Sequence, residues 1–347
     1  MAHELTIRAN GKAEMAFVGE TPWHGLGQPV TKGASIGVWL KEAGMDWEAK
    51  TSPISVNGKP DPAEDNGYEQ IQFADYKALY RSDDYSPLSI VGDGYKIVQP
   101  REVLEFFRGL VEQEGWHIHT AGTLRGGRKL WAMATNGEVA KVGKGDDVVR
   151  NIVLATSMDG SMRTTAMDTA VRVVCANTLA LAFGQAKQIV QVSHRTEFDA
   201  TLVRRTLGLK EDHFKTFMAQ SRELAETPVN LTQARDCLHA IFGVEQAKSK
   251  KPKVAWLGNL AEIDQEPEDE RESRSVARCL ELFAGDARGA GLASARGTAW
   301  GLLNAVTEHV DHEMGRSRDT GYDAALFGRG RTIKQQALAT LTEELLA

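Results

Sequence analysis

The sequence has little cysteine, and its three cysteines lie far apart, at Cys175, Cys237 and Cys279. No C-x-x-C pair is available to hold zinc, and an odd, scattered set is not the framework of a disulfide-stapled domain. Long apolar runs are also missing, since the longest, around Leu179 to Phe183, is far too short to span a bilayer. The N-terminal segment mixes acidic and basic residues where a signal peptide needs an apolar stretch. We therefore expect a cytoplasmic protein without membrane contact.

Signature motifs of several enzyme classes are missing as well. The sequence contains no G-x-S-x-G nucleophile elbow, no P-loop and no G-x-G-x-x-G string after a strand. Nucleotide hydrolysis and serine-hydrolase chemistry are thus not indicated by any motif. We expect a protein that is not an enzyme and that needs no cofactor.

The 347 residues, 42% of them hydrophobic and 25% charged, suffice for one substantial core and favour two. The formal net charge is −6, but the charges are unevenly distributed. Residues 116–210 hold thirteen Lys and Arg against seven Asp and Glu, so a basic middle is flanked by acidic ends. Such asymmetry is typical of a localised site for a polyanion.

Hydrophobic periodicity predicts an α+β fold, with a mostly antiparallel β-sheet core of hairpins and a backing helix, followed by a mainly helical C-terminal region. We divide the chain into an extended arm (1–35), an α+β core (36–196) and a helical region (197–347). The core contains a basic β-β-β-β-α unit. A charged linker is expected near 247–273, where blocks of opposite charge surround Pro252 and Pro267.

The expected elements follow from period, caps and turn residues. Strands are predicted at 47–54, 69–75, 77–81, 88–91, 116–124, 129–134, 148–157 and 161–175. Turns are predicted at Asn57-Gly58, Asn66-Gly67, Gly126-Gly127 and Asp159-Gly160. Helices are predicted at 36–43, 100–115, 176–186, 200–207, 211–225, 232–242, 276–283, 299–313 and 333–346. Asn177 and Thr178 are expected to cap the helix at 176–186.

The basic middle supplies the first candidate site residues. On the strand that returns from the Asp159-Gly160 turn, alternation predicts that Arg163 and Arg172 emerge from the sheet. With Arg125, Arg128 and Lys129 they are candidates to line a groove for a phosphodiester backbone. The alternative is a solvated sheet face whose charges serve solubility.

Two further groups of residues have candidate roles. Arg329 and Arg331 alternate with glycines near the C-terminus, so the backbone there can approach a ligand closely; incidental loop charges are the alternative. His309 and His312 share one helix face and are candidates for a metal site, although the spacing is not that of H-E-x-x-H. The alternative is a histidine pair on a surface helix. His117 and His119 share a strand face without a third ligand nearby.

Several strings together resemble a known family: PWHGLG at 22–27, the turn at 157–161, RVVCANTL at 172–179, NAVTE at 304–308 and the later Phe327-Gly328. They resemble the family labelled phage/plasmid-like protein, a domain of unknown function carried by phages and plasmids. The resemblance implies a mobile-element setting. In element order alone the middle region is similar to single-strand annealing recombinases of the RecT and Redβ type, which implies a ring or filament of subunits holding single-stranded DNA.

Three functional hypotheses follow. The first is a mobile-element recombination accessory that binds single-stranded DNA, forms a homo-oligomer and promotes strand annealing without ATP. The second is a metal-dependent enzyme acting on nucleic acid or another phosphoester. The third is a protein-binding module that acts on a host defence or a phage assembly.

Overall fold

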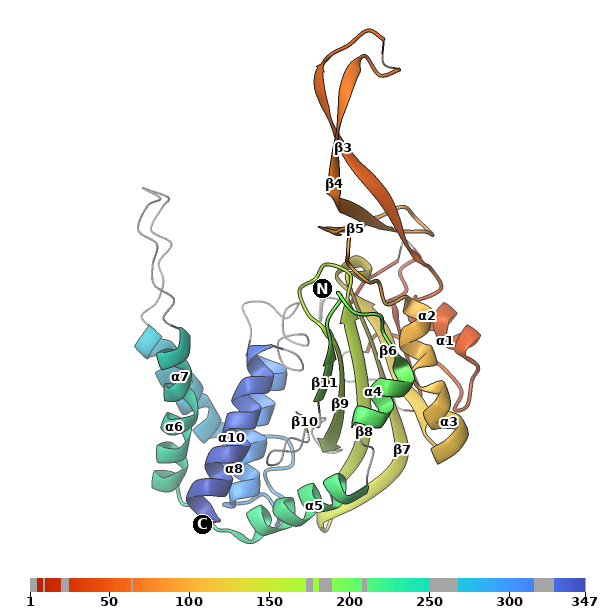
Figure 1. Cartoon of the computed structure of the whole chain (residues 1–347). Coiled ribbons are helices and arrows are strands. Elements are labelled where there is room, and N and C mark those ends of the chain that lie inside the picture. Colours follow the sequence, from red (N-terminus) through yellow and green to blue (C-terminus); the bar gives the residue numbers. More distant parts are fainter. Residues whose placement is uncertain are drawn as a thin grey trace. The chain divides into compact units, whose positions relative to one another are not determined.

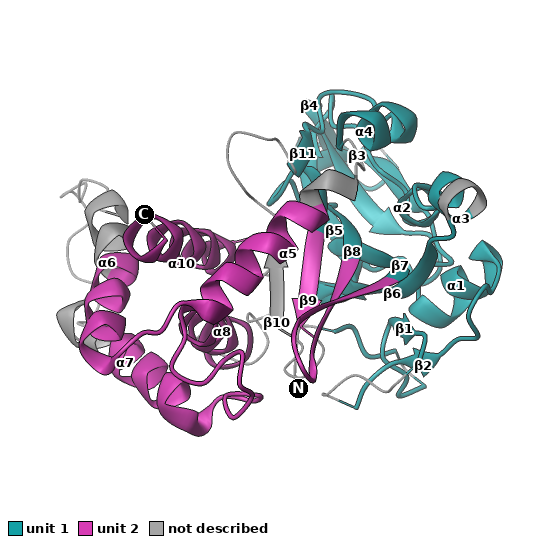
Figure 2. Cartoon of the chain, turned by 90° about the horizontal axis from the view of Figure 1, so that it is seen from below, with its two compact units in different colours: residues 1–137, 151–168, 185–209 teal, residues 138–150, 169–184, 210–347 magenta. Residues whose placement is uncertain are grey.

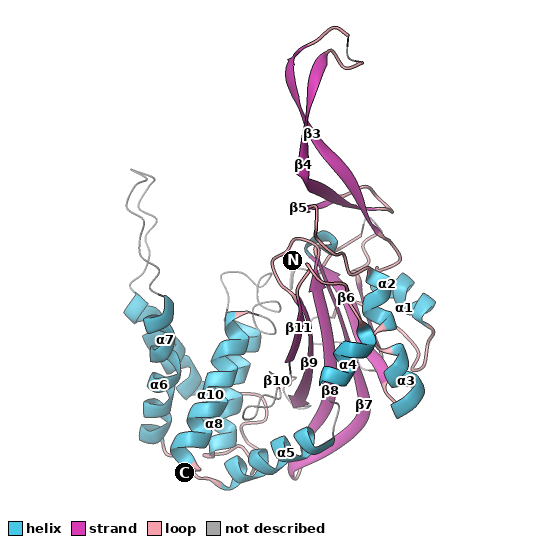
Figure 3. Cartoon of the chain, in the orientation of Figure 1, coloured by secondary structure: helices cyan, strands magenta, loops and turns pink. Residues whose placement is uncertain are grey.

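The computed structural model describes residues 5–8, 10–19, 25–63, 65–172, 177–180, 189–207, 211–249, 268–314 and 328–346. The predicted α+β class is confirmed, with antiparallel-rich sheets and a helical C-terminal part (Figure 3). The chain forms two compact units, each described here by itself (Figure 2). Unit 1 comprises residues 1–137, 151–168 and 185–209, and unit 2 comprises residues 138–150, 169–184 and 210–347.

The larger sheet has the strand order β10-β9-β8-β7-β6-β1-β2, with β11 also paired to β9. Its strands are β1 (Met15–Phe17), β2 (Gln28–Pro29), β6 (His117–Leu124), β7 (Lys129–Gly143), β8 (Asp146–Ser157), β9 (Thr164–Arg172), β10 (Asn177–Ala180) and β11 (Ile189–Val192). Strands β7, β8 and β9 contribute residues to both units. The predicted β6–β7 and β8–β9 hairpins are confirmed.

A second, three-stranded antiparallel sheet belongs to unit 1 and has the order β3-β4-β5. Its strands are β3 (Ala49–Pro60), β4 (Tyr68–Arg81) and β5 (Pro87–Gly92). The two long strands form a hairpin that extends beyond the rest of unit 1 (Figure 1). Only its base is buried, through Leu79, Arg81 and Ala49. The outer half of the hairpin is therefore exposed.

The helices of unit 1 build its core against the larger sheet. They are α1 (Ile36–Ala43), α2 (Pro100–Glu105), α3 (Arg108–Glu114) and α4 (Ala200–Leu207). The α1 helix has the predicted bounds because Ser35 caps its start by accepting from the Val38 amide, and Gly44 ends it in a left-handed conformation. Its buried Trp39 and Leu40 join Ile118 of β6 and Leu154 of β8 in one hydrophobic cluster.

Unit 2 is mainly helical. Its helices are α5 (Glu211–Glu226), α6 (Leu231–Ser249), α7 (Glu268–Glu281), α8 (Ala299–Glu308) and α10 (Arg329–Leu345), with π-helical turns η2 (Leu282–Asp286) and η3 (His309–Glu313). Every residue of α8 is buried, and Trp300 is 0% exposed. Helices α5, α7 and α10 pack against α8, whereas α6 packs against α7 and α10. Phe217, Ile241 and Leu338 belong to the same hydrophobic core.

Several predicted elements differ from the structure. The expected Asn57-Gly58 turn lies inside β3, and the hairpin instead turns near the predicted Asn66-Gly67. The single helix expected at 100–115 is divided into α2 and α3 at Phe106 and Phe107, whose rings are both fully buried. The helix expected at 176–186 is wrong over 177–180, which form β10, so Asn177 and Thr178 cap no helix there. The Trp23-His24 arm lies outside the described residues.

Candidate functional site

Two turns of unit 1 bring predicted basic residues together at one end of the larger sheet. The first turn, η1 (Arg125–Gly127) with Arg128, joins β6 to β7, and the second, at 158–163, joins β8 to β9. Strands β7 and β8 are neighbours. The Met158 amide donates to the carbonyl oxygen of Arg128 at 2.7 Å, which fastens one turn to the other. We call these two segments the basic turn edge.

Three predicted arginines are exposed on the basic turn edge: Arg125, Arg128 and Arg163. Within the described part of the chain, neither Arg128 nor Arg163 makes an ion pair. Arg125 adopts a left-handed backbone with φ of 54°, as do the two glycines that follow. Gly127 is required there, because a Cβ atom would lie 2.8 Å from the buried Trp47 ring. The first turn therefore holds a fixed conformation.

Lys129, also predicted to line the site, is 7% exposed and does not project from the turn. Its charge instead acts on Asp159 in the second turn. Burial opposes ionisation of Asp159, but hydrogen bonds from Ser161 and the charge of Lys129 hold the Asp159 pKa below its usual value. Ionised Asp159 accepts from the Ser161 amide at 2.9 Å, which closes the turn just before Arg163.

A half-buried tyrosine that the sequence did not reveal as part of the site supports the second turn. The Tyr95 hydroxyl donates to the Ser157 carbonyl at 2.7 Å, and burial raises the pKa of Tyr95 to about 12. Its ring stacks on His194 at 4.4 Å between centroids, and His194 Nε2 lies 3.1 Å from the Met162 carbonyl oxygen. Arg195 follows directly and is exposed. This brings a further arginine to the turn that carries Arg163.

The β3–β4 hairpin rises from the same end of the sheet. At its base, buried Arg81 donates to both carboxylate oxygens of Glu14 at 3.1 and 2.9 Å and lies over the Trp47 ring at 4.6 Å. The Ser89 hydroxyl of β5 donates to the Met158 carbonyl at 2.5 Å, so the three-stranded sheet contacts the second turn directly.

Aromatic side chains are exposed along the outer hairpin. Tyr68 is 42%, Phe73 44% and Tyr76 52% exposed, with Val56 and Ile71 also exposed on paired positions. Exposed rings on a projecting hairpin are suited to stacking on planar groups. We call this segment the aromatic arm. In the sequence, this segment showed only the alternating pattern of a strand. That pattern predicts a half-buried strand and gave no indication that the rings are exposed.

Arg172 does not emerge from the sheet as predicted. It is 2% exposed and belongs to unit 2, where its Nε and Nη2 donate to the two carboxylate oxygens of Asp146 at 2.6 and 2.8 Å. Asp146 is itself 0% exposed and also accepts from Ser294 and Trp300. Arg172 therefore forms a buried ion pair with Asp146, which lies 26 residues away in the sequence.

Arg329 and Arg331 begin α10 in unit 2, so they are not part of the basic turn edge of unit 1. Arg329 is exposed. Arg331 is half-buried, and burial lowers the pKa of its guanidinium. The predicted basic residues are thus divided between an exposed edge in unit 1 and separate positions in unit 2.

His309 is buried, and both of its ring nitrogens are engaged. Nδ1 lies 3.0 Å from Glu313 Oε2, and Nε2 lies 3.2 Å from the Ser275 hydroxyl. Metal binding at His309 would have to displace one of these partners. Among the described residues, no three His, Cys, Asp or Glu side chains lie close enough together to hold a metal ion. His312 therefore belongs to no such group. In this structure, the His309 ring is therefore held between Glu313 and Ser275.

Comparison with known proteins gives one match. A family model described as a domain of unknown function, DUF932, matches residues 87–334. The matched span includes the basic turn edge, while the whole aromatic arm precedes it. No curated protein and no solved structure matches the chain. Within the described residues, no helix is both long enough and apolar enough to cross a membrane.

Proposed function

The chain belongs to the DUF932 family, whose description names no activity, and we propose from the geometry of unit 1 that it binds single-stranded DNA. In this proposal, the basic turn edge holds the phosphodiester backbone and the aromatic arm stacks on bases. The binding serves strand annealing without ATP in a phage or plasmid, as a homo-oligomer in the form of a ring or filament.

The observation that carries the proposal is the joining of two arginine-bearing turns by the Met158–Arg128 hydrogen bond. Neighbouring strands lie about 4.8 Å apart, so successive hairpin turns place their side chains roughly 10 Å apart. Long arginine side chains at that spacing reach successive phosphates of one strand. Because Arg128 and Arg163 make no ion pair within the described residues, their charges are available to phosphates.

The aromatic arm favours single strands over duplex. In a duplex the base faces are stacked on one another, whereas a single strand presents them to exposed rings such as Phe73 and Tyr76. The arm and the turn edge meet through the Ser89–Met158 hydrogen bond, so one strand can contact both. Backbone contacts and stacking both tolerate any base sequence, and binding is therefore expected to be non-specific.

The setting in a mobile element rests on the resemblance of strings such as RVVCANTL at 172–179 to phage/plasmid-like proteins. The annealing role rests on the absence of a P-loop from the sequence and on an antiparallel sheet backed by helices. Annealing proteins hold one strand by its backbone and leave base edges open to a complementary strand. The basic turn edge would provide such contacts, from arginine side chains to the phosphates of the strand.

The proposal is tested by fluorescence anisotropy of a labelled oligothymidine, comparing three charge reversals. Arg128→Glu and Arg163→Glu are each expected to weaken binding about tenfold, because a phosphate contact becomes a repulsion. Arg235→Glu is the matched control, since Arg235 is an exposed arginine of α6 in unit 2. Equal affinities for all three variants would contradict the assigned surface.

The stacking role has a separate test. Replacing Phe73 and Tyr76 together by Ala is expected to weaken oligothymidine binding about tenfold or more, since base–aromatic stacking is worth about 1–3 kcal/mol per base. Both side chains are exposed, so the fold should be unaffected. Unchanged affinity would remove the aromatic arm from the DNA-binding surface and leave it as a surface for protein partners.

A further inference from the structure

A buried histidine contacts the second turn of the basic turn edge. His194 is 9% exposed and follows β11, the strand that pairs with β9. Its Nδ1 lies 3.0 Å from the Lys96 carbonyl oxygen, and its Nε2 lies 3.1 Å from the Met162 carbonyl oxygen. The ring therefore bridges the segment after β5 and the turn that carries Arg163.

Both partners of the His194 ring are backbone carbonyls. A carbonyl oxygen can only accept a hydrogen bond, whereas a neutral imidazole has one N–H donor and one nitrogen that accepts. A neutral ring at this position would donate to one carbonyl and turn a lone pair toward the other. Only the doubly protonated ring, the imidazolium, donates at both nitrogens. The two acceptors therefore match the charged form of His194.

The surroundings hold the ring and both carbonyls in place. The His194 ring stacks on Tyr95, with planes 12° apart, and the Tyr95 hydroxyl donates to the Ser157 carbonyl at 2.7 Å. The Lys96 amide donates to the His194 backbone carbonyl at 2.6 Å. On the other side, the Met162 carbonyl also accepts from the Ser157 hydroxyl at 2.9 Å. The number of protons on the ring, rather than a rotation, therefore decides whether both contacts form.

The charged and titratable groups on the segments around the ring are Tyr95, Lys96, Asp159, Arg163, Arg195 and Glu197. Burial raises the pKa of Tyr95 to about 12, and the hydrogen bond with Glu197 raises the pKa of Lys96. Burial opposes ionisation of Asp159, but its bonds with Ser161 keep the Asp159 pKa below the usual value. Arginine stays charged throughout. Histidine is thus the group here whose charge changes between about pH 5 and 8.

We propose that His194 makes DNA binding by the basic turn edge dependent on pH. The doubly protonated ring bonds to both Lys96 and Met162 and holds Arg163 and Arg195 at their places on the edge. Loss of one ring proton removes one of the two bonds and a buried positive charge, so single-stranded DNA is held less tightly as the pH rises. This inference rests on the proposed function, because it names a regulation of the same surface.

The protonation of His194 is measured by NMR of the histidine ring nitrogens in the full chain, without DNA. The His194 signals are those missing from the His194→Gln variant. Both ring nitrogens are expected to carry a proton at about pH 5, and one is expected to lose it by about pH 8. A ring with a single N–H at about pH 5, or one that keeps both protons at about pH 8, would overturn the proposal.

Oligothymidine anisotropy at fixed salt concentration measures the effect on DNA binding. The wild-type affinity is expected to fall about fivefold from about pH 5 to about pH 8, a modest coupling between a proton and a ligand. Such coupling is reciprocal, so bound oligothymidine should raise the pH at which His194 loses its proton. His194→Gln has no titrating ring, and its affinity should change less over the same range.

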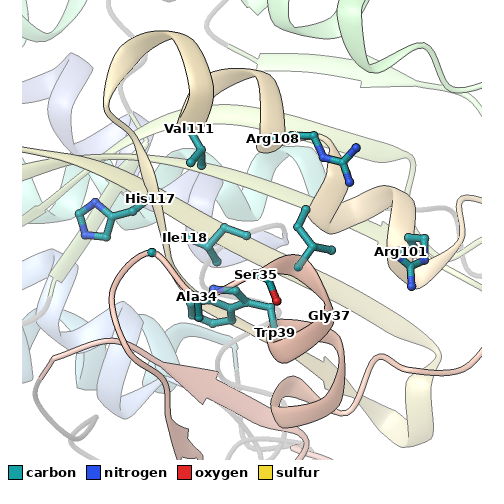
Figure 4. Close-up of a pocket in the computed structure, with 11 residues that line it drawn as sticks. Ala34, Ser35, Gly37, Trp39, Arg101, Arg108, Val111, His117 and Ile118 are labelled. Carbon is teal, nitrogen blue, oxygen red and sulfur yellow. The ribbon is translucent and has the colours of Figure 1, made fainter.

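His117 provides the matched control histidine in unit 1. It begins β6, eight residues of strand before the first turn, and Figure 4 shows its ring directed away from the pocket between α1, α2 and α3. Within the described residues, His117 Nδ1 has no hydrogen-bond partner, and burial, followed by the charge of Lys32, lowers the His117 pKa. Because this ring holds neither turn, His117→Gln should keep the pH dependence of the wild type.

The outcomes separate this regulation from the proposed function. Equal loss of pH dependence in His117→Gln and His194→Gln would overturn the assignment to His194. Tight oligothymidine binding that does not change with pH would overturn the regulation and leave the proposed function standing. Absence of oligothymidine binding at every pH would contradict the proposed function itself, and the regulation with it.

Discussion

Replacing Asp146 by Ala is expected to lower the free energy of unfolding of unit 2 by about 4 kcal/mol. Asp146 is 0% exposed and accepts hydrogen bonds from four donor atoms. Two come from Arg172 at 2.6 and 2.8 Å, one from the Ser294 hydroxyl at 2.5 Å, and one from the Trp300 indole at 3.0 Å. The alanine variant leaves all four without this acceptor.

The expected loss of unfolding free energy follows from what happens to Arg172, which loses its ion-pair partner. Breaking a buried ion pair costs about 3–5 kcal/mol, because the remaining charge loses the hydrogen-bonded counter-charge that offset its desolvation. The Arg172 side chain is 1% exposed, so water does not solvate it. Asp146→Asn keeps the shape of the side chain, so it should lower the free energy of unfolding somewhat less than Asp146→Ala does. Replacing Asp146 by Leu and Arg172 by Met together should restore most of the lost stability, since no unpaired charge then remains.

Urea unfolding followed by hydrogen exchange of α8 peptides measures the effect on unit 2. The matched control is Arg278→Met, because Arg278 also bonds to several carboxylates but its side chain is 35% exposed. Its loss should cost less than about 1 kcal/mol. Equal losses for Asp146→Ala and Arg278→Met would refute the reasoning that burial decides the magnitude.

The same pair gives a pH dependence. Burial by itself would raise the pKa of Asp146, but the bonds from Arg172, Ser294 and Trp300 outweigh it, and the pKa is lowered. A carboxyl with a lowered folded pKa stabilises the fold above its unfolded pKa of about 3.9, and loses this contribution as pH falls further. Unit 2 of the wild type should therefore lose more stability in acid than the Asp146→Asn variant does.

Two further predictions concern packing and thiols of unit 2. Gly301→Ala should cost about 2 kcal/mol or more in thermal unfolding, because its Cβ would lie 1.8 Å from the Ala295 carbonyl oxygen; an unchanged melting temperature would contradict this packing. Cys237 and Cys279 should resist a thiol reagent in the native protein, because burial raises the pKa of both thiols, that of Cys237 to about 11 with Glu344 adding to the shift. Mass spectrometry that finds either residue modified before unfolding would contradict it.

Local patterns were sufficient to predict several helices and hairpins. The bounds of α1 and α4 agree with the predicted ranges, since apolar period and capping residues are local signals. The segment 177–180 was wrongly predicted as helix. It pairs with β9, Asn177 opposite Arg172, and this long-range pairing overrides the preference of an Ala- and Leu-rich segment.

The exposure of the candidate site residues was predicted correctly only for those that lie on turns. Arg125, Arg128 and Arg163 are exposed as expected, because turns lie at the surface. Arg172 could not be assigned from alternation, since its partner Asp146 is 26 residues away. Arg195 was missed for a similar reason, because the contact of His194 with Met162 that brings it to the turn spans 32 residues.

The salt dependence of oligothymidine binding tests the central claim most directly. For the wild type, log K plotted against log salt concentration should fall steeply, with a slope of about −0.7 for each phosphate contacted. Replacing Arg125, Arg128 and Arg163 together by Gln should make the slope shallower by about 2, since three contacts are lost. A flat wild-type response, or the same slope in the triple variant, would contradict backbone binding by the basic turn edge.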